Sequence, residues 1–375
     1  MANNNNVAFK ISYNCIGCGL CEAVCPKQCI KIEERYNIGL LPVVDEIKCI
    51  DCGLCVKTCP TNRLNDKENI ELIKNVYKGK SKDRGVIINS SSGGIVSSLL
   101  IDLFYKKEID AAIVAYFDKE LNVYGDIITC KEEVLNHSGS FYHISKMLIN
   151  VKKIKDYKSI VFVGLPCQNI ALKKYIESYK IRNVYATISL FCTIGRMKNG
   201  MVEYLKERRY ILKELDNVYK YKSRYGERRP GEIIIEINSN KIVFENVDYL
   251  NKKDYFFTPN GCLNCNKLFG MEFSDISVGD NWGIKTDEKI AIFTANSNKG
   301  LKIIENNKLI DYTISNKNEL IKSQPLGYAL KNKNRNIINK NILLLKMLYR
   351  NIPKNNIINK ILIKYRGIIL NLIKS

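Results

Sequence analysis

The chain has 375 residues, 46% of them hydrophobic, which is enough to bury a sizeable core and to form two or three domains. No run of about 18 apolar residues occurs, which argues against a membrane-spanning helix, and no signal segment follows the N-terminal MANNNN. We therefore expect a cytoplasmic protein, in which fourteen cysteines favour metal ligation over disulfides. The net charge of +21 accompanies heavy use of Lys, Asn and Ile, which indicates genome base composition, so we expect no nucleic-acid partner.

Residues 7–62 carry one cysteine pattern twice, C-x2-C-x2-C-x3-C followed by proline. In two-cluster ferredoxins, the fourth cysteine of each such run ligates the other cluster. The pattern therefore predicts two [4Fe–4S] clusters with exchanged fourth ligands. The first is assigned to Cys15, Cys18, Cys21 and Cys59, and the second to Cys49, Cys52, Cys55 and Cys25.

The module resembles a bacterial two-cluster ferredoxin along nearly all of residues 7–62. The alternative is a pair of zinc sites, but these normally use two separated cysteine pairs. Cys29 lies outside the pattern, and we expect it to be a buried thiol.

The remainder of the chain is predicted to begin with a helical linker at 63–75. Strand-like and helix-like segments then alternate up to about residue 194, which indicates an α/β layer with a largely parallel sheet. Short β-like runs follow at 215–247, then a further α/β segment and helices from about 315 onward. We divide this region into an N-terminal part at 76–195, a C-terminal part at 196–330 and a basic helical tail at 331–375.

Cys167 and Cys192 each follow a predicted strand, and Cys262 and Cys265 form a C-x-x-C. Successive parallel strands end at the same edge of a sheet, where open α/β sheets bind ligands. These four cysteines could therefore hold a third cluster. The spacing equally allows Cys167 and Cys192 to be ordinary buried thiols and the C-x-x-C to be a redox dithiol or half of a metal site.

Six segments occur in the order found in the family of coenzyme F420 hydrogenase/dehydrogenase beta subunits, and the chain resembles that family over roughly residues 76–310. The segments are SSGGIVSSL, GSFY, GLPCQNIAL, FCTIG, CLNC and SDISVGDNWG. The resemblance implies a ferredoxin-like domain followed by a mixed α/β flavin-binding domain and a helical tail. It also implies an FAD beside a third [4Fe–4S] cluster, whose ligands would be Cys167, Cys192, Cys262 and Cys265.

The segment Ser92, Gly93 and Gly94 opens a predicted helix, where free amide groups could hold an electron-rich ring. A simple serine N-cap is the alternative. By resemblance this segment contacts the flavin. The further contacts that the resemblance implies are Ser140, Tyr142, Gln168, Asp280 and Trp282, although Trp282 could equally be a core residue. Phe141 stands where the family usually has a basic residue, which weakens the expectation that coenzyme F420 is the substrate.

The resemblance implies a flavin and iron–sulfur oxidoreductase that links a hydride carrier, reduced coenzyme F420 or a similar compound, to one-electron acceptors in a redox partner. The flavin could be FAD or FMN. One alternative is a related reductase with another substrate, such as a cell-envelope or polysaccharide precursor. Another is a non-catalytic electron-transfer adaptor.

The tail contains no acidic residue after Glu319, whereas twelve Lys and Arg lie between Lys322 and Lys374. It predicts two helices broken near Pro353, with basic and apolar residues interleaved. Such a segment could lie on an anionic inner membrane face or on an acidic partner. The alternative is a solvated basic face over a core-packed helix.

Overall fold

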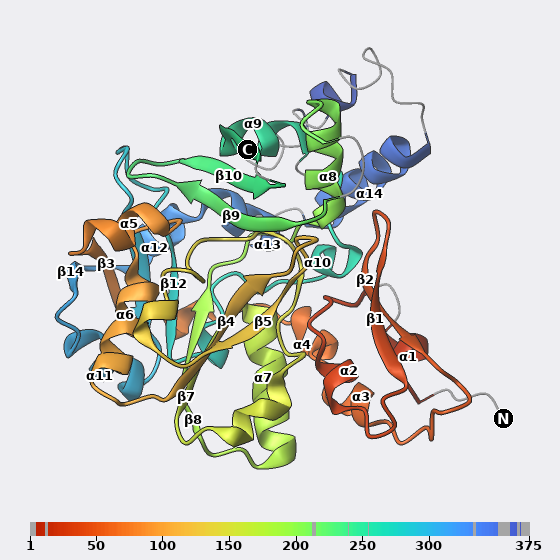
Figure 1. Cartoon of the computed structure of the whole chain (residues 1–375), viewed down its shortest axis with the longest axis horizontal. Helices are drawn as coiled ribbons and strands as arrows, with labels where there is room; N and C mark the ends of the chain where they lie inside the picture. Colours follow the sequence, from red (N-terminus) through yellow and green to blue (C-terminus); the bar gives the residue numbers. More distant parts are fainter. Residues whose placement is uncertain are drawn as a thin grey trace.

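A small cysteine-rich unit lies against a larger α/β unit in the computed structural model (Figure 1). The structure describes residues 5–11, 14–211, 215–238, 240–253, 255–332, 335–351, 361–365 and 368. Among these residues, no helix combines the length and the hydropathy that crossing a membrane requires.

The cysteine-rich unit is built from short helices around one β-hairpin. Strands β1 and β2 pair antiparallel from Ile30 opposite Val44 to Arg35 opposite Gly39. Val7, Ile30 and the cysteine side chains themselves form its small core. Its elements are α1 (Val7–Lys10), α2 (Leu20–Val24), β1 (Ile30–Arg35), β2 (Gly39–Val44), α3 (Leu54–Lys57) and α4 (Thr61–Leu64).

The connection at 63–75 is not the helical linker that the sequence predicts. Helix α4 ends at Leu64, and only a short 3-10 turn, Ile70–Leu72, follows before the first strand of the large sheet. The carboxylate of Glu68 accepts hydrogen bonds from the backbone N–H groups of Leu268 and Phe269, at 3.1 and 2.9 Å. Tertiary docking therefore holds this segment in place and overrides its helical propensity.

The large unit is organised on one nine-stranded sheet with the order β14-β3-β13-β12-β8-β7-β4-β5-β6. Its centre, β12-β8-β7-β4, is a continuous parallel block. On one side of the block, each of the pairs β12-β13, β13-β3 and β3-β14 is antiparallel, and on the other side β5 is antiparallel to β4. The sheet is therefore mixed rather than largely parallel. The strands are β3 (Asn75–Ser81), β4 (Ala111–Phe117), β5 (Val123–Ile128), β6 (Ser145–Lys146), β7 (Ile160–Gly164), β8 (Val184–Leu190), β12 (Ile276–Asp280), β13 (Ala291–Ala295) and β14 (Ile310–Ser315).

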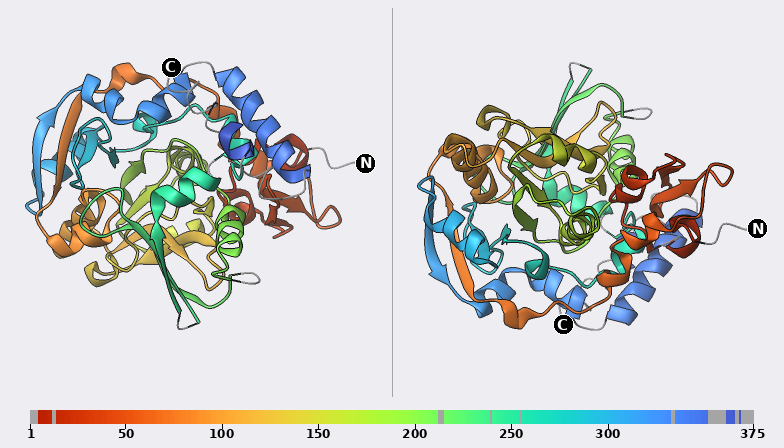
Figure 2. Two further views of the ribbon diagram at one scale, coloured as in Figure 1. Left: turned by 90° about the horizontal axis from the view of Figure 1, so that it is seen from above. Right: turned by 90° about the horizontal axis from the view of Figure 1, so that it is seen from below.

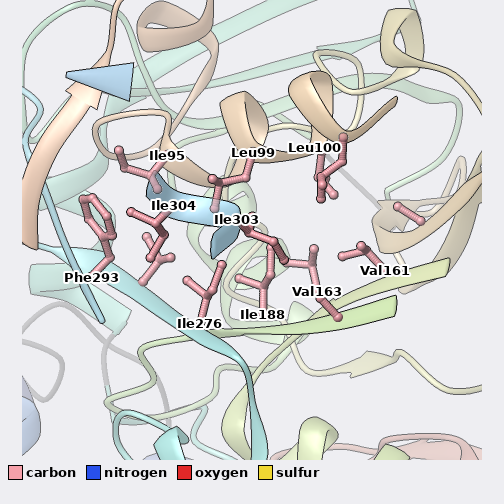
Figure 3. Close-up of a cluster of buried hydrophobic side chains, with 14 of the residues drawn as sticks. Ile95, Leu99, Leu100, Val161, Val163, Ile188, Ile276, Phe293, Ile303 and Ile304 are labelled. Atoms are coloured by element: carbon pink, nitrogen blue, oxygen red, sulfur yellow. The ribbon is translucent and has the colours of Figure 1, made fainter. Parts of the chain in front are cut away.

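Helices cover both faces of this sheet. On one face, α6 (Ile95–Tyr105) and α11 (Asn298–Glu305) pack Leu99 and Ile304 against Val163, Ile276 and Phe293 (Figure 3). On the other face, α7 (Pro166–Tyr179) packs together with α2 of the cysteine-rich unit. The second core therefore joins the two units. A short α5 (Arg84–Asn89) and 3-10 turns at Lys131–Glu133 and Val151–Asp156 complete this region.

A three-stranded antiparallel sheet, in the order β11-β10-β9, forms a third layer with α8 and α9 (Figures 1 and 2). It confirms the β-like runs predicted at 215–247. Its elements are α8 (Lys198–Glu207), β9 (Val218–Tyr225), β10 (Glu232–Ile237), β11 (Asn240–Glu245) and α9 (Asn246–Lys253).

The last helices extend from the large unit towards the cysteine-rich unit (Figure 2). Ile342 and Leu345 of α14 are fully buried against the segment that contains Phe256 and Phe257. The predicted break near Pro353 lies outside the described residues. The remaining elements are α10 (Asn260–Leu263), a 3-10 turn (Met271–Phe273), α12 (Lys317–Ser323), α13 (Pro325–Asn332) and α14 (Arg335–Asn351).

Candidate cluster and cofactor sites

The first chamber lies inside the cysteine-rich unit. Apolar side chains from α1, α2 and β1 line it, together with two prolines. The backbone N–H of Gly17 donates to the Cys15 sulfur over 3.3 Å. Its cysteines are the four assigned to the first cluster: Cys15, Cys18, Cys21 and Cys59.

The second chamber gathers the other four cysteines, Cys25, Cys49, Cys52 and Cys55. Cys25 and Cys59 thus lie in the chambers opposite to their sequence neighbours, as the exchanged pattern predicts. Cys29 also lines this chamber, with its Sγ 3.4 Å from the Sγ of Cys25. It is buried as expected, but it is a wall of the chamber and not a remote core residue.

The donor sets of both chambers suit [4Fe–4S] clusters, in which each iron takes one thiolate. Among the described residues, no three His, Cys, Asp or Glu side chains converge as one metal ion requires. Burial raises the pKa of the Cys15 thiol to about 12, and burial together with Cys59 raises the pKa of Cys18. Iron binds the thiolate form, so cluster assembly at these thiols would release protons.

A third cysteine group assembles at the edge of the large sheet. Cys167 lies in the first turn of α7, directly after β7, and Cys192 follows β8. A Cβ added to Gly195 would lie 2.8 Å from the Sγ of Cys262, so the loop after β8 touches the C-x-x-C segment. The structure therefore brings together Cys167, Cys192, Cys262 and Cys265.

The electrostatics of this third group confirm that the four side chains are neighbours. Burial raises the pKa of Cys167, and the charges of Cys265, Cys192 and Cys262 act in the same direction. Burial likewise raises the pKa of Cys192 to about 11 and that of Cys262 to about 12. Cys130, by contrast, interacts with Glu132 and Glu133 and is not part of the group.

The three groups form a row. The charge of Cys55 in the second chamber raises the pKa of Cys21 in the first chamber. The charge of Cys18 in the first chamber raises the pKa of Cys167 in the third group. The contact between units is close, since a Cβ on Gly261 would lie 2.2 Å from the backbone oxygen of Cys15. Leu148 N–H also donates to the Cys18 oxygen over 2.9 Å. The first chamber therefore lies between the other two groups.

The segment before α6 does not contain a simple serine N-cap. Gly94 occupies the N-cap position with a φ of +78°, and no side chain caps the helix. Gly93 packs on the sheet, where a Cβ would lie 2.6 Å from the oxygen of Gly79. The hydroxyl of Ser92 is buried and has no hydrogen-bond partner among the described residues. The first N–H groups of a helix have no intrahelical partner, so those at the start of α6 are candidates to donate to a ligand.

Two of the predicted contacts, Tyr142 and Asp280, meet at Arg224, a residue that belongs to no motif of the sequence. Burial opposes the charge of Arg224, but Asp280 and Tyr142 raise its pKa above the usual range. The guanidinium of Arg224 pairs with the Asp280 carboxylate and lies 4.8 Å from the Trp282 ring centroid. Trp282 is 44% exposed, so it is not a core residue.

The other predicted contacts differ in how free they are. Gln168 is buried, accepts from Leu165 N–H over 2.8 Å and donates to the Ser145 hydroxyl over 2.9 Å, so its amide is occupied within the protein. Ser140 is half-buried in the loop before Phe141. Phe141 itself is a core residue, 5.9 Å from Tyr221 between ring centroids.

Basic groups reach this region from other segments. The Lys289 ammonium is buried and donates to the backbone oxygens of Ser90 and Arg224, at 2.5 and 2.7 Å. Arg229 lies 5.3 Å from the Trp282 ring on the side chain's exposed flank. The basic segment KSRYGERRPG at 222–231 could have indicated this positive charge in the sequence, but only the tertiary structure places it beside Asp280.

Several polar atoms of this region are buried without a hydrogen-bond partner in the described part of the chain. They are Oγ of Ser90, Oγ of Ser92, Nη2 of Arg224 and Nδ2 of Asn281. Buried polar groups are normally satisfied, so such a set is typical of a ligand site. An electron-rich, anionic cofactor fits these donors.

Comparisons with known proteins agree with this architecture. The models for the N-terminal and C-terminal parts of coenzyme F420 hydrogenase/dehydrogenase beta subunits match residues 76–152 and 157–316. A 4Fe-4S dicluster domain matches residues 14–63. One of the subunits of the F(420)H(2) dehydrogenase of Methanosarcina mazei is 27% identical over 282 residues, which cover 72% of this chain and 77% of that protein.

Two proteins of Methanocaldococcus jannaschii are also similar. The coenzyme F420-dependent sulfite reductase is 26% identical over 286 residues, covering 71% of this chain and 42% of the reductase. An uncharacterised protein is 29% identical over 211 residues, covering 52% of this chain and 53% of that protein. The matched region thus spans about half the length of these two relatives.

A chain of the F420-reducing [NiFe] hydrogenase complex from Methanosarcina barkeri shares the fold. The TM-score is 0.53 at 17% identity, covering 72% of this chain and 92% of that chain. The two matching family models cover the domain that is built on the nine-stranded sheet. The chain belongs to the family of coenzyme F420 hydrogenase/dehydrogenase beta subunits, which are oxidoreductase components, and carries a 4Fe-4S dicluster domain.

Proposed function

We propose that the protein passes electrons between a two-electron hydride carrier, reduced coenzyme F420 or a similar compound, and a one-electron partner. FAD and three [4Fe–4S] clusters would serve the transfer. When bound, the flavin supplies the exchange between hydride transfer and single-electron transfer, and the clusters supply the relay.

The observation that carries this proposal is the adjacency of the third cysteine group to the region of unpartnered polar atoms. The guanidinium of Arg196 lies 5.2 Å from the Tyr142 ring centroid, and its charge lowers the pKa of Cys192 against the effect of burial. Tyr142 in turn lies beside Arg224. One arginine thus connects a candidate cluster ligand to the candidate flavin site.

The chain's own residues have separate tasks in this proposal. Twelve thiolates hold the clusters, and the N–H groups at the start of α6 bind the flavin together with the Ser92 hydroxyl. Arg224, held by Asp280, presents its free Nη2 to an anionic group. The exposed Trp282 ring offers an aromatic surface against which the cofactor can stack. The partner is a redox protein, or one of the other subunits of a complex, that meets the cysteine-rich unit.

A related reductase with a different substrate is the second candidate, and Phe141 is the observation that favours it. The buried Phe141 ring leaves no basic group at that position of GSFY. Arg224, Arg229 and Lys289 nevertheless supply positive charge to the same region. We therefore prefer an anionic hydride carrier.

An anaerobic spectroscopic titration tests the proposal. The purified protein should contain one flavin per chain, and reduced coenzyme F420, but not NADH, should bleach it. Cluster absorbance should then fall in a second phase. Bleaching by NADH alone would assign a different donor. Purification without any flavin, and without uptake of added FAD or FMN, would support the adaptor hypothesis.

A further inference from the structure

Two buried lysines from the C-terminal helices lie against the third cysteine group. Lys331, at the end of α13, is 7% exposed and donates to the backbone oxygen of Cys265 over 2.7 Å. Lys346, in α14, is 5% exposed and donates to the Thr258 oxygen and the Asn260 side chain, both at 2.5 Å. Both ammonium groups therefore point at the segment that carries Cys262 and Cys265.

Neither lysine has a carboxylate partner among the ion pairs of the described residues. Their hydrogen bonds in this part of the chain go to neutral oxygens. The charge of Lys331 lowers the pKa of Cys192 and of Cys262 against the effect of burial, and the charge of Cys262 acts on Lys346. Buried charge without a counter-charge is unfavourable, so a negative group at this site would stabilise both cations.

The helices that carry these lysines are held firmly against the cysteine loops. A Cβ on Gly327 would lie 2.9 Å from Oγ1 of Thr193, so α13 approaches the loop after Cys192 closely. The fully buried Ile342 and Leu345 anchor α14 in the core just before Lys346 in sequence. The Asn37 side chain also donates to the Lys346 oxygen over 3.4 Å. The ammonium positions are therefore built into the fold.

We propose that Lys331 and Lys346 are counter-charges that raise the reduction potential of the third cluster, an inference that rests on the proposed cluster at these cysteines. A cluster held by four thiolates is an anion, and reduction adds one more negative charge. Buried cations nearby stabilise the reduced form more than the oxidised form, because the surroundings screen little. The third cluster then accepts an electron readily from the flavin side. These lysines position charge and do not ligate iron.

This role separates the two lysines from the rest of the basic tail. Most Lys residues in a Lys-rich chain lie in solvent, and a fully buried one is rare unless it is paired. Here two of them converge on the same segment from different helices. Lys331 donates to the backbone of Cys265 itself, whereas Lys346 donates to Thr258 and Asn260, so Lys331 should have the larger effect.

The test is an EPR-monitored redox titration of the full chain, purified anaerobically. Lys331→Met should keep about twelve irons per chain but lower the midpoint potential of the third cluster. Lys346→Met should lower it less, and Lys331→Arg should leave it close to the wild-type value. The ferredoxin potentials should not change in any of these variants.

Lys253→Met is the matched control, because Lys253 is equally buried but pairs with Glu207 and the Tyr349 hydroxyl. An unchanged potential in Lys331→Met, or an equal shift in Lys253→Met, overturns the inference. Lys331→Met could also lose the third cluster. In that case, a Lys331→Arg variant that keeps the cluster supports the charge role, and a Lys331→Arg variant that also loses it overturns the inference. If the wild-type protein contains about eight irons per chain, the proposed third cluster is absent, and the proposed function fails rather than the role of the lysines alone.

Discussion

The two chambers of the cysteine-rich unit and the third cysteine group each bring four cysteines together, but they do so by different structural means. Each chamber collects its cysteines from residues 15–59, where they lie in the short helices α2 and α3 and in the loops beside them. The third group collects its cysteines from three elements separated by up to 98 positions, between Cys167 and Cys265. One arrangement depends on local turns, and the other depends on the completed sheet.

This difference teaches which part of the molecule tolerates change. The chambers need the close spacing of cysteines and few distant contacts. The third group needs β7 and β8 side by side, and it needs the C-x-x-C segment folded over their ends. Damage at the third group should therefore leave the chambers intact.

The largest expected effect is that of Cys167→Ala. Removing one of four thiolates should abolish the third cluster or leave a three-iron form, while the ferredoxin spectra and flavin reduction by the donor survive. Reduction of the ferredoxin clusters by the reduced flavin should fail, because the middle of the relay is missing. Iron analysis and stopped-flow spectroscopy measure both results.

Wild-type rates for both the flavin and the ferredoxin clusters in Cys167→Ala would contradict this prediction. Loss of flavin with about twelve irons retained would also contradict it, since Cys167 would then be a pocket residue.

The exchanged ligands provide the next test. Cys59→Ala should convert the cluster held by Cys15, Cys18 and Cys21 to a three-iron form and leave the other ferredoxin cluster unchanged. Cys29→Ala is the matched control, because Cys29 lines the second chamber only 3.4 Å from Cys25 yet is not assigned as a ligand. EPR of the oxidised proteins distinguishes the forms. Loss of iron in Cys29→Ala would show that the second chamber uses a different set of thiolates.

Gly261→Ala should weaken the contact between the two kinds of site. The new Cβ would lie 2.2 Å from the Cys15 oxygen, so the backbones must separate. We expect roughly 1–3 kcal/mol lower unfolding free energy and slower electron transfer from the third cluster to the first, with all iron retained. Thermal unfolding and stopped-flow traces measure the two effects. Gly85→Ala, whose Cβ would meet only the Asp83 side chain, is the control and should change neither.

The smallest expected effect concerns the tail, whose membrane contact is a proposal. One face of α14 is core, but Leu343, Leu344 and Met347 are exposed. Anionic liposomes should bind the protein weakly, and salt should reduce the binding. Met347→Glu should reduce flotation further, whereas Ile314→Glu, at an exposed position on β14, should not. Equal loss in both variants, or flotation insensitive to salt, would argue against contact through the tail.

Hydrophobic periodicity predicts much of the fold. The predicted helix that Ser92, Gly93 and Gly94 open is α6, and the predicted strands before Cys167 and Cys192 are β7 and β8. The errors came where distant contacts decide local structure. Glu68 docks on the backbone near Phe269 and prevents a helical linker, and the antiparallel strands beside β12 cannot be told from parallel ones by their composition.

The cysteine spacing of residues 15–59 is sufficient to predict the 4Fe-4S dicluster domain, because four thiols at steps of three and four leave few other arrangements. Only the tertiary structure decided what surrounds the third group. Arg224, Lys331 and Lys346 come from segments with no motif, and their burial beside Asp280 or the cysteines depends on how the sheet, β9 and the last helices pack. The electrostatic effect of a charge on a site depends on its distance from the site and on the screening between them, and sequence spacing determines neither.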